Sequence, residues 1–234
     1  MTGKITLVGV GPGDPELLTL KAVREIKSAD LLVYPQKPGE KSLALSIAET
    51  HISVHSEHMP IDVPMAVPRA PAAKVYDEMS VEIIERLKDG QSVVYLCEGD
   101  PLFYGSAMYV LAGMSHVPIE VVPGVTSLTA AAAVAQRPLA ARNETLKVLP
   151  APLDDEKLKA ELSSTQSAAI IKVGRHFDRV RDLLKTTGHA SNAIIIEYAT
   201  QGRQKITPLL EYAPNERPYF STILCYNGDE KWGR

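Results

Sequence analysis

Short apolar runs alternate with helical patterns along the first half of the chain. The runs at 5–10, 31–34 and 93–97 each stop abruptly at glycine, proline or polar residues, which is typical of buried strands. Between the first two runs, Thr19 is a candidate N-cap for a helix over residues 20–27. A strand, a helix and a strand in this order predict a βαβ unit and therefore a parallel sheet.

The remaining pattern of the first half predicts one long helix and one long loop. Apolar residues recur every four positions over residues 74–89, and Gly90 follows, so this segment should be an amphipathic helix. Residues 51–73 contain four prolines and no clear period, so we expect an irregular loop there. The other expected elements are helices at 41–50 and 105–114 and a strand at 119–122.

The second half continues the α/β alternation. Pro123 and Gly124 interrupt the chain, and we place a domain boundary there, which divides it into residues 1–122 and 123–234. The expected helices lie at 126–135, 154–162 and 177–185, and the expected strands at 145–149, 168–173, 192–197, 203–207 and 219–226.

Composition and charge limit the classes of function that this protein could have. A net charge of −3 argues against broad binding to nucleic acid or to anionic membranes. The apolar runs are too short to span a bilayer, and we expect no signal peptide at the N-terminus. Cys97 and Cys225 are far apart and form no metal-ligand pair, so a reduced, cytoplasmic setting is expected. His51, His55 and His58 fall in extended chain rather than on one helix face, and we expect no metal site.

Two loops at strand ends carry candidate chemistry. The turn at 9–14 has three glycines at alternate positions, but it departs from the dinucleotide-binding fingerprint because Asp14 stands where the third glycine belongs and Pro12 removes a donor. An NAD-dependent dehydrogenase is therefore disfavoured. After the strand at 93–97, Glu98 and Asp100 flank Gly99. This second loop could bind a cationic or hydroxyl-rich ligand, or it could be a simple turn in which Asp100 caps the next helix.

Two further strand exits, at Lys172–Arg175 and Glu197–Thr200, are also polar. Together with 98–101 and 124–127 they predict a ligand cleft between two sheets.

Four of these segments together resemble a known family. Residues 9–22, Glu98–Gly105, Pro123–Ser127 and Lys172–Arg175 occur in the order and at separations typical of the tetrapyrrole (corrin/porphyrin) methyltransferases, and the resemblance covers essentially the whole chain. It implies two α/β lobes, the first with a mainly parallel sheet and the second with a mixed sheet. It also implies an S-adenosylmethionine cofactor in the cleft between the lobes, an anionic tetrapyrrole substrate, and a homodimer.

The resemblance also assigns site residues. The positions at which family members contact the cofactor correspond to Pro12, Glu98, Gly99, Asp100, Phe103, Thr126, Ser127, Val173 and Ala199. Basic residues that could bind the substrate carboxylates are Lys37, Arg69, Arg137, Arg142 and Arg175. The pattern assigns no catalytic residue, although Tyr104 or a carboxylate could help to remove a proton after methyl transfer.

Within the family, Tyr34-Pro35, Val63-Pro64-Met65 and Cys97-Glu98-Gly99-Asp100 most resemble the members that methylate a meso carbon of a corrin precursor in cobalamin synthesis. Methylases of uroporphyrinogen carry an acidic residue where this chain has Pro35, which argues against that substrate. Two alternatives stay open. One is methylation at another corrin carbon, and the other is a non-catalytic adenosine-binding module.

Overall fold

The computed structural model describes residues 3–63, 70–213 and 219–228, with the backbone alone for residues 70–73. The chain divides after Thr126 into two compact units, residues 1–126 (unit 1) and 127–234 (unit 2). Each unit has its own sheet and its own apolar core, and each is described by itself.

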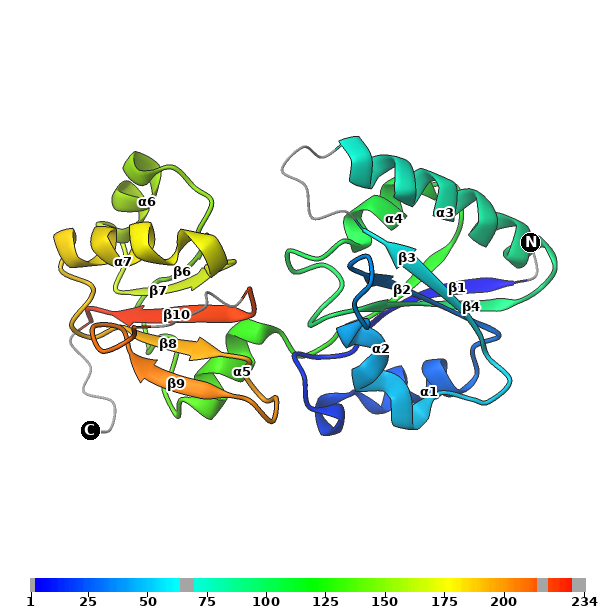
Figure 1. The fold of residues 1–234 in the computed structure, drawn as a ribbon, viewed down its shortest axis with the longest axis horizontal. Coiled ribbons are helices and arrows are strands. Elements are labelled where there is room, and N and C mark those ends of the chain that lie inside the picture. Colours follow the sequence, from blue (N-terminus) through cyan, green and yellow to red (C-terminus); the bar gives the residue numbers. More distant parts are fainter. Residues whose placement is uncertain (1–2, 64–69, 214–218, 229–234) are drawn as a thin grey trace. The chain divides into compact units, whose positions relative to one another are not determined.

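Unit 1 contains a five-stranded parallel sheet (Figure 1). Its strands are β1 (Lys4–Gly9), β2 (Leu31–Gln36), β3 (Glu57–Asp62), β4 (Ser92–Cys97) and β5 (Ile119–Val122). They lie in the order β3-β2-β4-β1-β5, and every neighbouring pair is parallel. The carboxyl ends of all five strands therefore meet at one edge of the sheet, which confirms the parallel sheet expected for the first lobe.

Helices cover both faces of this sheet. Helices α1 (Leu20–Lys27) and α2 (Leu43–Ala48) pack on one face, while α3 (Ala70–Lys88) and α4 (Ala107–Gly113) pack on the other (Figure 1). Alternate side chains of each strand point to opposite faces, so Leu7 joins the α3/α4 core and Val8 joins the α1/α2 core. Thr19 caps α1 as expected, since its Oγ1 accepts a hydrogen bond from the Ala22 N–H at 3.1 Å.

The prediction of a long irregular loop over residues 51–73 was wrong. This stretch holds the last residue of a short 3-10 helix (Glu49–His51), all of β3 and the start of α3, which begins at Ala70 rather than at residue 74. The β3 sequence lacks an apolar period because it is an edge strand, where Pro60 is tolerated and one side is open to solvent. Pro64, Met65 and Arg69 lie outside the described residues.

Unit 2 contains a mixed five-stranded sheet. Its strands are β6 (Leu146–Pro150), β7 (Ser167–Ile171), β8 (Ile194–Glu197), β9 (Lys205–Pro208) and β10 (Ser221–Tyr226), in the order β6-β7-β10-β8-β9. Among these described strands, β6 and β7 alone pair in parallel, and the other neighbouring pairs are antiparallel. Helices α6 (Asp155–Leu162) and α7 (Phe177–Thr186) cover one face, and α5 (Ser127–Val134) lies on the other (Figure 1).

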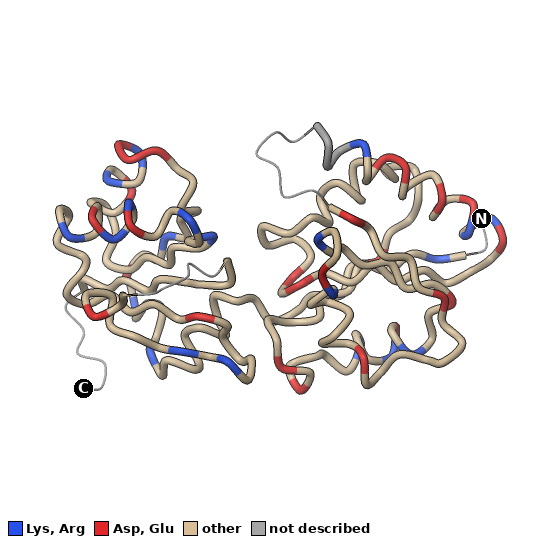
Figure 2. Tube along the Cα trace, viewed as in Figure 1, with Lys and Arg blue, Asp and Glu red and all other residues tan. Residues whose placement is uncertain are grey.

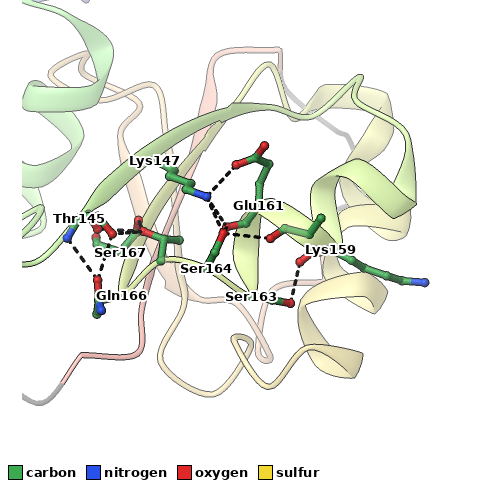
Figure 3. Close-up of polar contacts among 10 residues, drawn as sticks. Thr145, Lys147, Lys159, Glu161, Ser163, Ser164, Gln166 and Ser167 are labelled. Carbon is green, nitrogen blue, oxygen red and sulfur yellow. Dashed lines mark hydrogen bonds and ion pairs between the residues drawn. The ribbon is translucent and has the colours of Figure 1, made fainter.

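A polar cluster fastens α6 to the sheet of unit 2. Lys147, on β6, donates from Nζ to the Glu161 carboxylate at 2.7 Å, to the Glu161 carbonyl at 3.2 Å and to Ser164 Oγ at 2.7 Å (Figure 3). The Lys147 ammonium lowers the pKa of the Glu161 carboxyl through this hydrogen bond and through its charge. The cluster therefore holds the end of α6 against β6.

Charged residues lie mainly on the helices and loops. Both acidic and basic positions occur on α3 and around α6 and α7, while the strands of both sheets are mostly uncharged (Figure 2). Among the helices that the structure describes, none is long and apolar enough to cross a lipid bilayer.

Candidate functional site

The order of strands in unit 1 places a ligand crevice between β1 and β4. These neighbours are parallel, but β1 leads to α1 on one face of the sheet and β4 leads to α4 on the other. The connections thus depart in opposite directions at the carboxyl edge. Such a switch point is where ligands bind in open α/β sheets. Both loops singled out in the sequence, 9–14 and 98–101, begin there.

The two loops are joined backbone to backbone. Gly11 N–H donates to the Gly99 carbonyl at 3.2 Å, and Gly99 N–H donates to the Gly11 carbonyl at 2.8 Å. Val10 N–H also donates to the Cys97 carbonyl at 2.9 Å, which continues the β1–β4 ladder past the ends of the strands. The loops that follow β1 and β4 are therefore held together by backbone hydrogen bonds.

The segment just after β5 packs against these two loops. A Cβ on Gly9 would lie 2.6 Å from the Gly124 nitrogen and 2.7 Å from the Gly99 carbonyl oxygen, and a Cβ on Gly124 would overlap the same carbonyl. Only glycine fits at these positions. We call the backbone of Gly9, Gly11, Gly99 and Gly124 the glycine cradle. The sequence pattern found the first three of these glycines, but not their contact with Gly124.

Asp100 is engaged by the backbone on both of its carboxylate oxygens. Oδ1 accepts a hydrogen bond from Leu102 N–H at 2.9 Å, and Oδ2 accepts one from Gly124 N–H at 3.0 Å. The first bond is a local turn. The second joins the exit of β4 to the exit of β5. Asp100 does not cap α4, because that helix begins seven residues later, at Ala107, and no side-chain bond caps its start.

Glu98 differs from Asp100 in its surroundings. Its side chain is exposed at the surface, but the surrounding protein limits its hydration, and this desolvation raises the pKa of the carboxyl to about 6. The positive charge of Lys37 acts in the opposite direction. Lys37 itself pairs with Glu40, with 3.2 Å between Nζ and Oε2. Glu98 is thus a carboxylate that changes charge close to neutral pH.

The loop after Asp100 rests on a buried polar pair. Tyr95 is fully buried on β4, and its hydroxyl lies 2.8 Å from Ser106 Oγ, just before α4. Phe103 and Tyr104 pack edge to face with their ring centroids 5.1 Å apart, and Tyr104 is 45% exposed with φ of 56°. A non-glycine residue at positive φ stores backbone strain. Sequence reasoning missed Tyr95 as a support, because its position reads only as part of a buried strand.

Unit 2 carries three of the expected cofactor residues. Ser127 begins α5, and Val173 and Ala199 follow β7 and β8. The Val173 side chain is buried in the core of unit 2, so only its backbone is available to a ligand. Thr126 ends unit 1.

The exits of β7 and β8 in unit 2 are also strained. Both strands run antiparallel to β10, so their carboxyl ends share one edge. Lys172, Tyr198 and Thr200, which lie just past these ends, have positive φ. Strained backbone often marks a ligand site.

The expected substrate-binding residues have varied surroundings. Arg137 is half-buried and donates to the Asn192 carbonyl, whereas Arg142 and Arg175 are exposed. Arg69 lies outside the described residues. Apart from Lys37, which is in unit 1, the described candidates lie in unit 2. Within residues 3–63, 70–213 and 219–228, no group of three or more histidine, cysteine or carboxylate side chains could hold a metal ion.

Comparisons with known proteins identify the family. The chain is 33% identical to the precorrin-2 C(20)-methyltransferase of a Sinorhizobium species over 95% of this chain and 94% of that protein. It is 31% identical to the cobalt-precorrin-2 C(20)-methyltransferase of Salmonella typhimurium, over 96% of both chains. A crystal structure of the uroporphyrin-III C-methyl transferase from Thermus thermophilus, in complex with S-adenyl homocysteine, superposes with a TM-score of 0.70 and 26% identity, over 95% of this chain and 97% of that one.

The family model for tetrapyrrole methylases matches residues 4–213, which includes both sheets except β10. Residues 9–22, Glu98–Gly105, Pro123–Ser127 and Lys172–Arg175, which carried the resemblance in the sequence, all fall within that match. The chain belongs to the Tetrapyrrole (Corrin/Porphyrin) Methylases.

Proposed function

We propose that this protein transfers a methyl group from S-adenosylmethionine to the C20 meso carbon of precorrin-2, or of its cobalt form, in cobalamin biosynthesis. The observation that carries this proposal is the similarity to two C(20)-methyltransferases, one named for precorrin-2 and one for cobalt-precorrin-2, each over at least 94% of both chains. Pro35, at the end of β2, supports the same choice, because methylases of uroporphyrinogen resemble this chain but carry an acidic residue there.

The glycine cradle fits the methyl donor. A donor that consists of a nucleoside and an amino acid needs room close to the backbone, and three strand ends lined by glycine leave that room. The related Thermus enzyme was crystallised with the demethylated product. We assign the donor site to Pro12, Glu98, Gly99, Asp100, Phe103 and Thr126 of unit 1 and to Ser127, Val173 and Ala199 of unit 2.

Methyl transfer from a sulfonium does not require a single dominant catalytic side chain. The donor supplies a methyl group already activated on a sulfonium. The protein has to align the carbon, the methyl group and the sulfur and to exclude water. The ring's carboxylates need cations, for which Lys37, Arg69, Arg137, Arg142 and Arg175 are the candidates. The methylated meso carbon must then lose a proton, and the exposed acceptors near the cradle are Glu98 and Tyr104.

Incubation with methyl-labelled donor tests the proposal. The protein is supplied with precorrin-2, with and without cobalt, and the label is located by NMR. Label at C20 in either arm supports the proposal, and the arm that reacts identifies the substrate form. Label at another carbon would assign the alternative methylation within the family. Donor binding without transfer to either ring would instead favour a non-catalytic adenosine-binding module.

Two expectations about the protein's setting belong to the same proposal. We propose a homodimer, as the family resemblance implies, and its mass can be measured by light scattering during gel filtration. We also propose a reducing, cytoplasmic compartment, which agrees with the two cysteines, Cys97 and Cys225, being buried thiols without a disulfide.

A further inference from the structure

The three donor residues assigned to unit 2 lie toward one edge of its sheet. Val173 and Ala199 follow β7 and β8, and both strands run antiparallel to β10, so their carboxyl ends lie at the same edge. Helix α5 begins at Ser127, and Arg137, just past its end, donates to the carbonyl of Asn192, before the start of β8. The start of α5 therefore lies toward the carboxyl ends of β7 and β8 (Figure 1). We call this edge of the unit 2 sheet the donor edge.

The arginine candidates of unit 2 divide between the two edges of the sheet. Arg175 follows β7 and lies at the donor edge. Arg137 and Arg142 lie at the opposite edge, because Arg137 binds beside the start of β8 and Arg142 precedes the start of β6, which runs parallel to β7. Strands rise by about 3.3 Å per residue, so the four residues of β8 alone separate the two edges by about 13 Å.

A further arginine, which the sequence pattern did not single out, lies at the donor edge. Arg203 belongs to the loop between β8 and β9, and its guanidinium lies over the ring of Tyr198, 3.7 Å from the ring centroid. Tyr198 N–H donates to the Phe220 carbonyl at 2.8 Å, which holds its backbone beside the start of β10. Stacking uses one face of a guanidinium and leaves the N–H groups at its rim for a carboxylate.

Arg175 and Arg203 together form a pair of available cations. Both are exposed, and neither forms an ion pair with a carboxylate among the residues that the structure describes. They follow β7 and β8, which lie on either side of β10. Two strand spacings place the ends of β7 and β8 about 10 Å apart. Cations so separated suit a ligand whose carboxylates are spread around a ring, rather than one small anion.

We propose that Arg203, held over Tyr198, binds a carboxylate of the tetrapyrrole substrate together with Arg175, and that Arg137 and Arg142 do not. This inference rests on the proposed function, which supplies the substrate. It narrows the unit 2 candidates to the edge that carries the donor residues, where the ring has to meet the methyl group. Arg137 has a structural role instead, because it fastens the end of α5 to the segment before β8.

Steady-state methyl transfer at saturating donor tests the role of Arg203. Arg203→Gln removes the charge and the paired N–H donors, so KM for the tetrapyrrole should rise by about ten-fold or more, while kcat stays within about two-fold. The affinity for S-adenosylhomocysteine, measured by calorimetry, should stay unchanged, which also shows that the variant is folded. An unchanged KM, or an equal loss of donor affinity, would overturn the inference.

Arg181→Gln is the matched control. Arg181 also lies over an aromatic ring, that of Phe177 at 5.4 Å, but it is on α7 and pairs with Asp178. This variant should keep the wild-type KM. Arg142→Gln, at the edge opposite the donor edge, should raise KM by far less than Arg203→Gln. An equal rise in either variant would contradict the assignment to Arg203.

Changes at Tyr198 test whether its ring holds the arginine. Tyr198→Leu removes the stacking surface and should raise KM, whereas Tyr198→Phe, which keeps the ring, should rescue most of that loss. Tyr198→Leu added to Arg203→Gln should cause little further loss, because both changes act on the same contact. Losses that multiply would show that the two residues act separately, and the proposed pairing would fall.

The same assay separates the inference from the proposed function. A wild-type protein that methylates neither precorrin-2 nor its cobalt form would overturn the proposed function, and the inference with it. An active wild type whose KM is the same as that of Arg203→Gln would overturn the inference alone.

Discussion

Gly11 and Gly99 exchange two backbone hydrogen bonds, at 3.2 and 2.8 Å, across the exits of β1 and β4. This pair lies where the chain departs to opposite faces of the unit 1 sheet, and its hydrogen bonds hold the loops after β1 and β4 together. Loops that bind ligands are often mobile. Here the crevice is instead lined by backbone held in place on both sides, which reduces the ordering cost of binding.

Replacement of Gly99 by alanine should impair binding more than stability. Gly99 has φ of 66°, so Gly99→Ala should cost about 1–2 kcal/mol of unfolding free energy, as an L-residue does in the left-handed region. Gly39 is the matched control, with φ of 77° and nothing within 4 Å of an added Cβ. Both variants should unfold at similarly lower urea concentrations, but only Gly99→Ala should weaken binding of S-adenosylhomocysteine. Equal binding by the two variants would contradict the site.

Donor binding should depend on pH through Glu98. Desolvation by the surrounding protein raises the pKa of this carboxyl to about 6, so its negative charge is lost as the pH falls from 7 to 5, and affinity for S-adenosylmethionine should fall by up to about ten-fold. The effect on stability has the opposite sign. The folded state binds this proton more tightly than the unfolded state, so the contribution of Glu98 to stability declines as the pH rises from 4.5 to about 6.

Calorimetry at several pH values checks this dependence. Glu98→Gln should bind with an affinity that no longer changes over this range. Glu156→Gln, the same change at an exposed position on α6, should keep the wild-type pH dependence. A wild-type affinity that is constant from pH 5 to 7 would remove Glu98 from the donor site.

Acid should destabilise unit 2 through His189. This side chain is only 5% exposed, and its Nδ1 lies 3.0 Å from the Thr187 carbonyl oxygen, so Nδ1 carries the proton of the neutral ring. Burial lowers the pKa of His189, while its backbone hydrogen bonds act in the opposite direction. The unfolded chain therefore binds the additional proton more readily, and stability should be lost as the pH falls below about 6.5.

Urea unfolding at pH 7 and pH 5.5 measures this loss. His189→Gln should reduce the difference in unfolding free energy between the two pH values, even if it lowers stability at both. His116→Gln, at an exposed histidine, provides the comparison and should leave the difference as it is in the wild type. The assignment fails if both variants keep the full pH dependence.

The Lys147 cluster should matter more for stability than the exposed Lys159–Glu156 pair of α6. Lys147→Met removes three hydrogen bonds that fasten Glu161 and Ser164 to β6 (Figure 3), so the unfolding transition should shift to lower urea concentration. Lys159→Met removes only an exposed pair with Glu156, one turn away on the same helix, and such pairs contribute little. An equal shift for both variants would show that the cluster is no more than a surface contact.

The sequence predicted most of the elements because their signals are local. The apolar run at Val93–Cys97 and the Thr19 cap depend only on near neighbours, and both appear in the structure as expected. The strand β3 was missed for the opposite reason. Its residues Glu57–Asp62 carry no apolar period, and it is a strand only because its backbone pairs with β2 at the edge of the sheet.

For the candidate site, the sequence by itself determined which loops matter: 9–14 and 98–101 follow buried strands and are rich in glycine and carboxylates. It also determined the family, since four motifs in order are visible without any coordinates. The tertiary structure decided what each residue does in its loop. It alone showed that Gly124 packs against Gly9 and Gly99, and that Asp100 is engaged by backbone while Glu98 is exposed. Such contacts join residues that lie 24 or more positions apart in the chain, and the order of strands in the sheet, which no local pattern encodes, brings them together.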